Sequence, residues 1–444
     1  MSTQPLSINN DSSPQNVVTN NLTAARGTFK ELVTLGLGVK ELDAITGVFD
    51  TVVTTDLTVA SGKINLTDVS CNIGIGANAL SNITTGTDDI AIGCDALYSN
   101  TTGSKNMAIG HKALYSNTIS DYNLAIGYSA LQQNTAPYNI AVGFETLMSN
   151  TSGYNNVGFG LSALTANTTG ISNVALGVNS LFSNTTGNYN LAIGDNILKA
   201  SNADYNIGIG YNALRKNTSG AYNLAIGQNA LFSNLGGANN IALGVNALYS
   251  NQVGNNNLAI GLNALTDSTG DSNLAIGNDA LYKNTGTQNV AVGSGALGAN
   301  AACTTNVAVG FAALNVNVGN SNVAIGTSAL LANTTGANNV AIGYLAMNTN
   351  TTGTDNVVVG YNAGVPPGRS NCIVLGKNAG MKITADGQIA IGSASLTGAV
   401  INPGGVSAAT FATIPLGAAN IANTKWFNVW IADIEYYIPL WPAV

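Results

Sequence analysis

Few residues in this 444-residue sequence have types and spacing that could do acid, base or nucleophilic chemistry. His111 is the only histidine, so a Ser-His-Asp triad would have to use it, and no Gly-x-Ser-x-Gly elbow is present. Asp88 and Asp89 are the only adjacent acidic pair. Paired carboxylates serve glycoside hydrolysis, but these two fall in a turn, where solvated side chains are expected. We therefore predict no catalytic residue, no cofactor and no enzyme.

The cysteines give no sign of a metal centre. Cys71, Cys94, Cys303 and Cys372 lie far apart and show neither the local spacing of metal ligands nor a dense disulfide framework. Free cysteine commonly behaves as a small buried apolar residue. We expect that role for all four, and we predict no metal site.

Tyrosine is the residue type that could contact a ligand. Several tyrosines recur one repeat apart, just before an apolar strand-like segment. Such rows on a weakly charged surface suit carbohydrate or protein recognition, and packing between subunits is the alternative. The candidate ligand-contact residues are Tyr122, Tyr138, Tyr189, Tyr205 and Tyr222.

Composition excludes several classes of protein. Only 8% of residues are charged, against roughly 25% in typical soluble domains, yet 45% are apolar. The net charge is −7 with 14 scattered basic residues, so the basic stripe of a nucleic-acid-binding protein is missing. No apolar run approaches the roughly 20 residues of a membrane helix. The polar start of the chain predicts no signal peptide.

A short repeat organises most of the chain. Its unit reads Asn-φ-Ala-φ-Gly-x-Asn-Ala-Leu-x-x-Asn-Thr-Thr-Gly-x-x, where φ is a larger apolar residue. The glycine after the second φ recurs twenty times from Gly76 to Gly392. Successive copies are either seventeen or sixteen residues apart, in no regular order. So regular a period predicts one coil per unit, stacked as a solenoid. At about 4.8 Å per step, the nineteen steps predict a shaft of roughly 90 Å.

The φ-Ala-φ segment has the period of two expected of a β-strand. We expect the φ side chains to fill the coil and the small middle residue to point outward. That residue is never polar in the twenty copies, which predicts a closely packed partner, either another copy of the chain or the chain's own termini. The predicted oligomer interface comprises Ala91, Ala108, Ala125, Ala192, Ala225, Ala259, Ala275 and Ala341.

The second half of the unit is expected to contain tight turns. A polar residue followed by Ala-Leu favours an N-cap that opens a single helical turn. Asn-Thr-Thr-Gly then closes the coil, because glycine accepts positive φ and Asn and Thr satisfy backbone groups locally. The Asn before each strand is expected to stack as an amide ladder along the rod.

Units such as Asn223–Asn240 and Asn322–Asn339 resemble the head repeats of YadA-type trimeric adhesins. They are still more similar to the longer Asn-Thr-Thr-Gly repeats in fibres of bacteriophages and large DNA viruses. The resemblance covers the whole repetitive part of the chain and implies a left-handed parallel β-roll that forms a homotrimer. The unit of this chain is longer than the adhesin unit.

The chain is thus expected to be mainly β, a parallel β-solenoid (β-roll) of about twenty coils with small β-rich terminal regions. The predicted parts are a flexible arm (1–26), a β-rich neck or attachment region (27–71), the repeat shaft (72–392) and a C-terminal cap or trimerisation region (393–444). In the last of these, Lys425–Trp441 is expected to form short strands around a turn.

The resemblance implies a structural fibre or surface-decoration protein of a virus particle, located on the virion surface, that supplies a rigid rod and host attachment. Its implied partners are its own copies in a homotrimer, other virion proteins and host-surface carbohydrate or protein, without nucleic acid or membrane insertion. A bacterial trimeric adhesin or surface-layer structural protein on the cell surface is one alternative. A carbohydrate-degrading tailspike is another.

Overall fold

The computed structural model describes residues 70–299, 302–381 and 383–392, and outside these ranges only the backbone of strands β1–β6 and β27–β29. The chain divides into two compact units, Met1–Thr67 and Asp68–Val444. The first unit holds six short strands, and the second holds the long solenoid. Each is described by itself.

Strands β1–β6 associate as three parallel pairs. Their bounds are β1 Leu22–Ala24, β2 Gly27–Phe29, β3 Leu32–Val33, β4 Leu42–Ala44, β5 Gly47–Phe49 and β6 Val52–Val53. The pairs β1–β4, β2–β5 and β3–β6 are all parallel, and in the first of them Leu22 is the partner of Leu42. This region is therefore also built from repeats, longer than those of the shaft. Strand β1 lies in the segment 1–26 that was predicted to be a flexible arm, and most of that segment lies outside the described residues.

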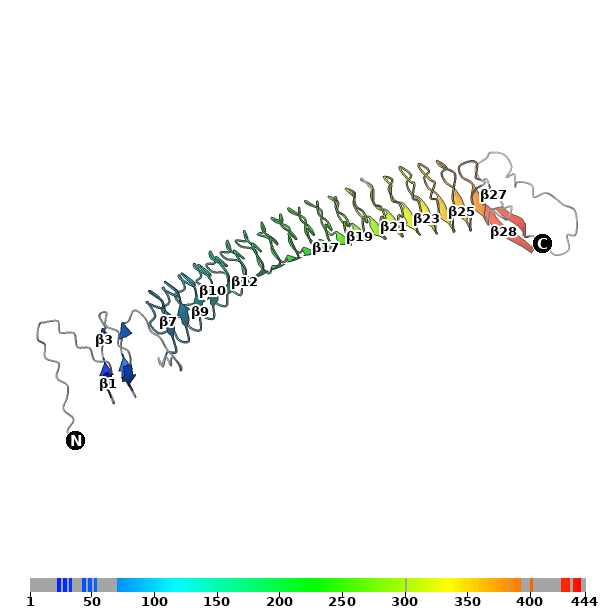
Figure 1. Cartoon of the computed structure of the whole chain (residues 1–444). Helices are drawn as coiled ribbons and strands as arrows, with labels where there is room; N and C mark the ends of the chain where they lie inside the picture. Colours follow the sequence, from blue (N-terminus) through cyan, green and yellow to red (C-terminus); the bar gives the residue numbers. More distant parts are fainter. Residues whose placement is uncertain are drawn as a thin grey trace, which may run out of the picture. The chain divides into compact units, whose positions relative to one another are not determined.

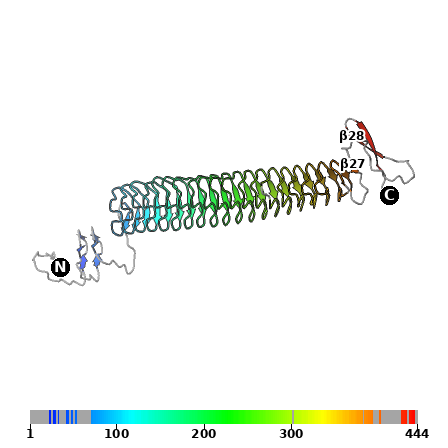
Figure 2. The same cartoon turned by 90° about the horizontal axis from the view of Figure 1, so that it is seen from above.

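The shaft contains twenty strands, each of three residues. They are β7 Ile73–Ile75, β8 Ile90–Ile92, β9 Met107–Ile109, β10 Leu124–Ile126, β11 Ile140–Val142, β12 Val157–Phe159, β13 Val174–Leu176, β14 Leu191–Ile193, β15 Ile207–Ile209, β16 Leu224–Ile226, β17 Ile241–Leu243, β18 Leu258–Ile260, β19 Leu274–Ile276, β20 Val290–Val292, β21 Val307–Val309, β22 Val323–Ile325, β23 Val340–Ile342, β24 Val357–Val359, β25 Ile373–Leu375 and β26 Ile389–Ile391. Each pairs in parallel with the next, in strict register, as Ala225 does with Ala242. The strands follow one another along one side of the solenoid (Figure 1), and the coils appear as narrow loops set side by side in Figure 2. The predicted parallel β-solenoid is confirmed.

Backbone hydrogen bonds join neighbouring coils around the circumference, beyond the strands as well as within them. In the coil of β16, Leu224 N–H donates to Asn240 O at 2.9 Å, and Leu231 N–H donates to Ala247 O at 2.9 Å. Ser233 N–H also donates to Tyr249 O at 2.9 Å. Because each of these bonds joins a residue to the one that precedes its equivalent in the next coil, a nearly constant repeat length keeps every coil in register.

The repeat glycine is required where the strand ends. Gly227 has φ of +132°, and a Cβ atom added there would lie 2.5 Å from Gly244 O in the next coil. Successive backbones approach too closely for any side chain at this position. The same glycine therefore recurs after each strand of the shaft.

The turn after this glycine is not helical, so the predicted N-cap and helical turn are wrong. Asn229 and Leu231 both have left-handed backbone, with φ of 58° and 51°. Ala230 N–H donates to Gly227 O at 3.4 Å, and Asn234 N–H donates to Leu231 O at 3.2 Å, so β-turns follow one another. The Leu231 N–H is committed to the next coil, which a continuing helix would not allow. Left-handed leucine is disfavoured by roughly 1–2 kcal/mol, and complete burial of this side chain offsets that cost.

The strand side chains point the opposite way from the prediction. The middle residue is buried in nineteen of the twenty strands, whereas the first and third residues are never buried. In most coils the narrow interior is already filled by leucines from the turn, which leaves space for no more than a methyl group on the strand. The larger Val358 and Val374 are buried at the end of the shaft, where Gly364 and Gly380 replace the turn leucine. The outward placement of the predicted interface residues is therefore wrong, because all are fully buried within the chain itself: Ala91, Ala108, Ala125, Ala192, Ala225, Ala259, Ala275 and Ala341.

Paired changes in side-chain size confirm this packing. Where the turn residue that is usually Ala becomes Ile197, the facing strand residue is Gly208, and a Cβ there would lie 2.4 Å from Ile197 Cγ2. Likewise, a Cβ on Gly158 would lie 2.6 Å from Thr146 Cγ2. A larger residue on the turn is thus matched by a smaller one on the strand. Protein interiors are packed as densely as crystals of small organic molecules, so a larger side chain at one position requires a smaller one at the position that it faces.

The predicted asparagine ladder is confirmed. Asn223 Oδ1 accepts hydrogen bonds from both the backbone N–H and Nδ2 of Asn240, at 3.0 and 3.1 Å. Asn240 Nδ2 also donates to Gly254 O at 2.8 Å. These amides are buried, and a buried polar group is stable only when it is hydrogen bonded.

The parallel ladder ends at β26. Strand β27 (Val400–Ile401) pairs with β26 in the antiparallel direction. Further along the chain, β28 (Lys425–Ile431) and β29 (Ile434–Leu440) pair antiparallel, where the sequence predicts short strands around a turn. The roles predicted for 393–444 as cap and trimerisation region stay predictions.

We expect Gly208→Ala to destabilise the solenoid by about 1–3 kcal/mol, because the new methyl group overpacks the coil against Ile197. Adding Ile197→Ala should recover much of this loss, since it gives the Ala–Ala arrangement that Ala213 and Ala225 have one coil later. Thermal unfolding of both single variants and the double variant forms a double-mutant cycle.

Gly236→Ala is the matched control. The nearest atom to a Cβ at Gly236 is Ser219 Oγ, at 3.4 Å, so a small effect is expected. Equal losses from the two glycine variants, or the absence of rescue by Ile197→Ala, would contradict the inward placement of the middle strand residue.

Candidate interaction surface

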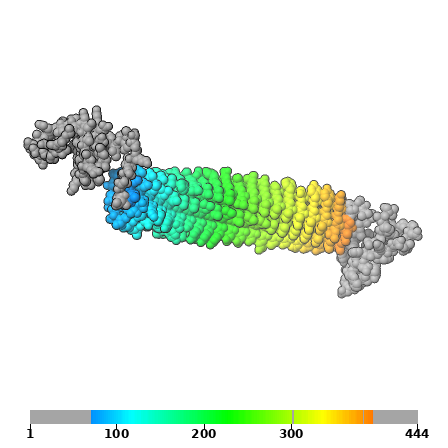
Figure 3. Space-filling model, turned by 90° about the horizontal axis from the view of Figure 1, so that it is seen from below, coloured from blue at the N-terminus to red at the C-terminus, as the bar shows by residue number. Residues whose placement is uncertain are grey.

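The outer face of the long sheet is the most extensive chemical feature of the shaft. Each strand from β7 to β26 presents its first and third residues outward, and all forty are Ile, Leu, Val, Met or Phe. Ile226, Ile241 and Phe159 retain 39%, 39% and 42% of their surface exposed in the single chain. Figure 3 views the solenoid from the side on which the strands lie in Figure 1, where the coils form a continuous ridged surface. We call these forty side chains the apolar sheet face.

The apolar sheet face is larger than a typical exposed patch. Twenty strands spaced by about 4.8 Å, each about 10 Å long, give a projected area of roughly 900 Å². The largest patch on an ordinary monomer covers about 300–600 Å². Within the described ranges only one ion pair occurs, between Arg369 and Asp386 at 3.8 Å. Because all forty of its side chains are apolar, the face can bind a partner through apolar contact.

The predicted ligand-contact tyrosines lie along one border of this face, two residues before each strand. All are exposed, and neighbours one coil apart stack. The rings of Tyr189 and Tyr205, and of Tyr205 and Tyr222, have centroids 4.9 Å apart. Tyr122 and Tyr138 stack at 5.3 Å. Desolvation raises the pKa of Tyr205, and charge repulsion from the phenol groups of Tyr189 and Tyr222 acts in the same direction. The structure thus places these five residues in two separate stacks.

The residue after each repeat glycine forms the opposite border. His111, Tyr128 and Phe144 stack in sequence along it, with centroids 5.1 and 5.2 Å apart. Tyr344 and Tyr361 stack further along at 5.2 Å. Both borders of the apolar sheet face therefore carry exposed aromatic rings, which are enriched at protein interfaces because they combine large contact area with low conformational entropy cost.

The cysteines divide into two classes. Cys303 and Cys372 are buried, as predicted, but Cys71 and Cys94 are exposed, so the prediction of buried apolar residues is wrong for these two. The exposed pair sits in the two border columns, at positions where other coils carry tyrosine.

Asp89 is the titratable group most affected by the fold. It takes the ladder position that Asn occupies in the next coils, and its carboxylate accepts hydrogen bonds from Asn106 N–H at 2.8 Å and Asn100 Nδ2 at 3.0 Å. Burial raises the pKa of Asp89 to about 6, although these hydrogen bonds act in the opposite direction. The expectation of a solvated carboxylate is wrong here because Asp89 is fully buried, while Asp88 beside it is exposed.

No family model matches the chain, and neither the curated proteins nor the solved structures contain a significant match. Among the described residues, none forms a helix with the length and apolarity needed to cross a membrane.

We expect Asp89→Asn to raise the melting temperature at pH 8 and to have little effect at pH 4. The folded protein holds the Asp89 proton up to a pKa of about 6, against the ordinary value of 3.8. Wild-type stability should therefore fall as pH rises through this window. The shift corresponds to a loss of at most roughly 3 kcal/mol of folding free energy at high pH. The uncharged amide of the Asp89→Asn variant avoids this loss.

Thermal unfolding at the two pH values measures this difference. Asp88→Asn removes the same charge from the exposed neighbour and should not reproduce the gain at pH 8. A gain from Asp89→Asn that is equal at both pH values, or a loss at pH 8, would contradict the burial of an ionised carboxylate.

Proposed function

We propose that this chain is the subunit of a structural fibre, a rigid rod that associates with its own copies along the apolar sheet face. The observation that carries the proposal is the row of forty outward apolar side chains of the apolar sheet face. Its projected area of roughly 900 Å² is comparable with the roughly 800 Å² that each partner buries in a stable interface. Burial of such a face is favourable because it removes apolar surface from water.

A homotrimer is the assembly that we propose. Its support is the similarity of the Asn-Thr-Thr-Gly units to those of trimeric viral fibres and adhesins. The apolar sheet face replaces the alanine row as the surface through which the copies meet. One such face on each of three parallel rods could converge on a common axis, which leaves the turns outside.

The same similarity supports a place on a virus particle, as a fibre or surface-decoration protein in contact with other virion proteins. We further propose that the two stacks of exposed tyrosines contact a host-surface carbohydrate or protein. A rod of stacked coils gives reach, and a stack of aromatic rings offers flat apolar surfaces to sugar rings or protein side chains. A bacterial surface fibre is the second setting in which this rod would serve attachment.

Self-association is tested by placing alternating charges on three successive strands, with Ile226→Asp, Leu243→Lys and Ile260→Asp in one chain. Opposite charges on adjacent strands can pair on the surface of a single chain, but burial of these charges in an interface costs several kcal/mol. We expect light scattering to give three times 44.9 kDa for the wild type and dissociation of the variant on dilution.

The matched control places the same pattern on the turns of the same coils, with Ser233→Asp and Ser250→Lys beside the native Asp267. Ser250 already hydrogen bonds to Asp267 at 3.0 Å, so little disturbance is expected and the mass should be unchanged. A wild-type mass of one chain would contradict self-association, and a mass of two chains would contradict the trimer.

The tyrosine proposal is tested by Tyr189→Ala, Tyr205→Ala and Tyr222→Ala in one chain. We expect weaker binding to host cells or to a glycan array with an unchanged oligomeric mass, because each ring is exposed in the coil. Loss of the oligomer would instead assign these rings to the seam between chains, and unchanged binding would contradict a role in recognition.

The viral setting is tested by mass spectrometry and antibody labelling of purified particles from the source of the sequence. Detection of the chain as rods on the particle surface is expected. Its absence from particles, together with labelling of a bacterial cell surface, would contradict the viral setting and support the alternative.

A further inference from the structure

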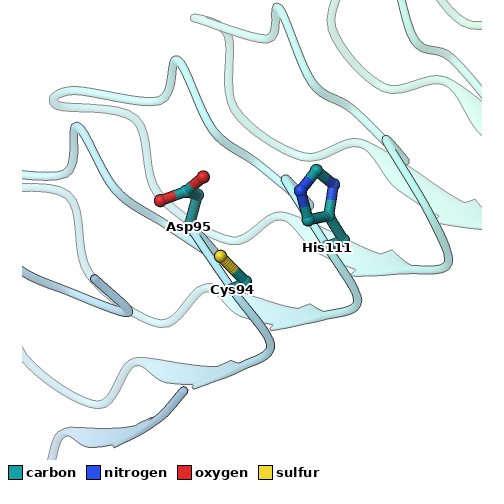
Figure 4. Close-up of side chains that lie close together, drawn as sticks. All are labelled: Cys94, Asp95 and His111. Carbon is teal, nitrogen blue, oxygen red and sulfur yellow. The ribbon is translucent and has the colours of Figure 1, made fainter. Parts of the chain in front are cut away.

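Three potential metal ligands meet near the start of the solenoid, on the border that follows the repeat glycines. Cys94 and Asp95 directly follow the glycine after β8, and His111 directly follows the glycine after β9. Their ligand atoms, one from each residue, all lie within 4.8 Å of one another. Figure 4 shows the three side chains on the same side of two successive coils. Within the described residues this is the one such group of three.

The surroundings orient two of the three side chains. The His111 ring stacks on Tyr128 with centroids 5.1 Å apart and planes 9° apart. Asn78 Nδ2 donates a hydrogen bond to Asp95 Oδ1 at 2.9 Å. His111 Nδ1 is buried and has no hydrogen-bond partner in the described part of the chain, so no hydrogen bond holds the imidazole at that atom. A hydrogen bond that fixes the orientation of a ligating carboxylate, such as the one from Asn78 to Asp95, is typical of metal sites.

The donor set determines the class of ion. A thiolate, an imidazole and a carboxylate together suit a borderline transition-metal cation such as Zn²⁺, and not Ca²⁺ or Mg²⁺, which require several oxygen ligands. Zn–S and Zn–N bonds of about 2.3 and 2.0 Å at a tetrahedral angle place the two donor atoms about 3.5 Å apart. Cys94 is exposed and Asp95 and His111 are partly exposed, so side-chain rotation can close the remaining gap.

We propose that Cys94, Asp95 and His111 bind one Zn²⁺-class cation, with the fourth coordination position open to water or another ligand. The ion would join the coil of β8 to the coil of β9, the second and third of the shaft. This site does not show the short sequence spacing that is typical of metal ligands. The residues Cys94 and His111 are one full repeat apart in the sequence, and the solenoid converts that separation into contact between neighbouring coils.

The test is a Co²⁺ titration of the full chain, purified without a histidine tag, stripped with chelator and kept reduced. We expect about one Co²⁺ per chain, with the absorption band of a thiolate–cobalt bond, and displacement by Zn²⁺. Zn²⁺ should also raise the melting temperature, because a ligand that binds only the folded state stabilises it. Cys94→Ser and His111→Ala should each abolish both responses. Asn78→Ala should weaken binding by about 10-fold or more.

Cys71→Ser is the matched control, because Cys71 is also exposed but lies outside the group. This variant should bind Co²⁺ as the wild type does. The absence of stoichiometric binding by a folded wild type would overturn the proposal. So would wild-type binding by both Cys94→Ser and His111→Ala, which would show that the ion is adventitious or bound elsewhere.

Discussion

Hydrogen bonding between coils at nearly every part of the circumference is the constraint on which the rest of the structure depends. It fixes one register for each coil and brings successive backbones so close that Gly227 leaves no space for a Cβ atom. It also commits the N–H of Leu231 to the next coil, although this requires left-handed backbone at a leucine. The repeat length, the glycine and the left-handed leucine therefore all follow from the hydrogen bonds between coils.

The same constraint decides which side chains face outward. A coil with so short a circumference encloses only a thin interior, which the turn leucines, the asparagine ladder and one small strand residue, most often Ala, fill. The branched side chains of each strand have no place inside and form the apolar sheet face. A single chain in water thus leaves its most extensive apolar surface uncovered, and this is the physical basis for proposing assembly with its own copies.

The regular features of the coil could be predicted from the sequence. Which side chains are buried inside the coil could not. The period, the strand at each φ-Ala-φ segment and the Asn223–Asn240 ladder follow from local chemistry. The inward direction of Ala225 could not be found by alternation alone, because the pattern is apolar on both faces. It required knowledge that Leu231 already fills the coil. The burial of Asp89 and the proximity of Cys94 to His111 are not visible in the local sequence, because both depend on how one coil stacks on the next.

The most direct measurement is a high-resolution cryo-electron microscopy structure of the assembled full-length protein. Our account predicts that Leu224 and Ile226 lie between neighbouring chains while Ala225 stays inside its own coil. Density that places Ala225 at the contact between chains, or that leaves Leu224 and Ile226 facing water in the assembled rod, would contradict it.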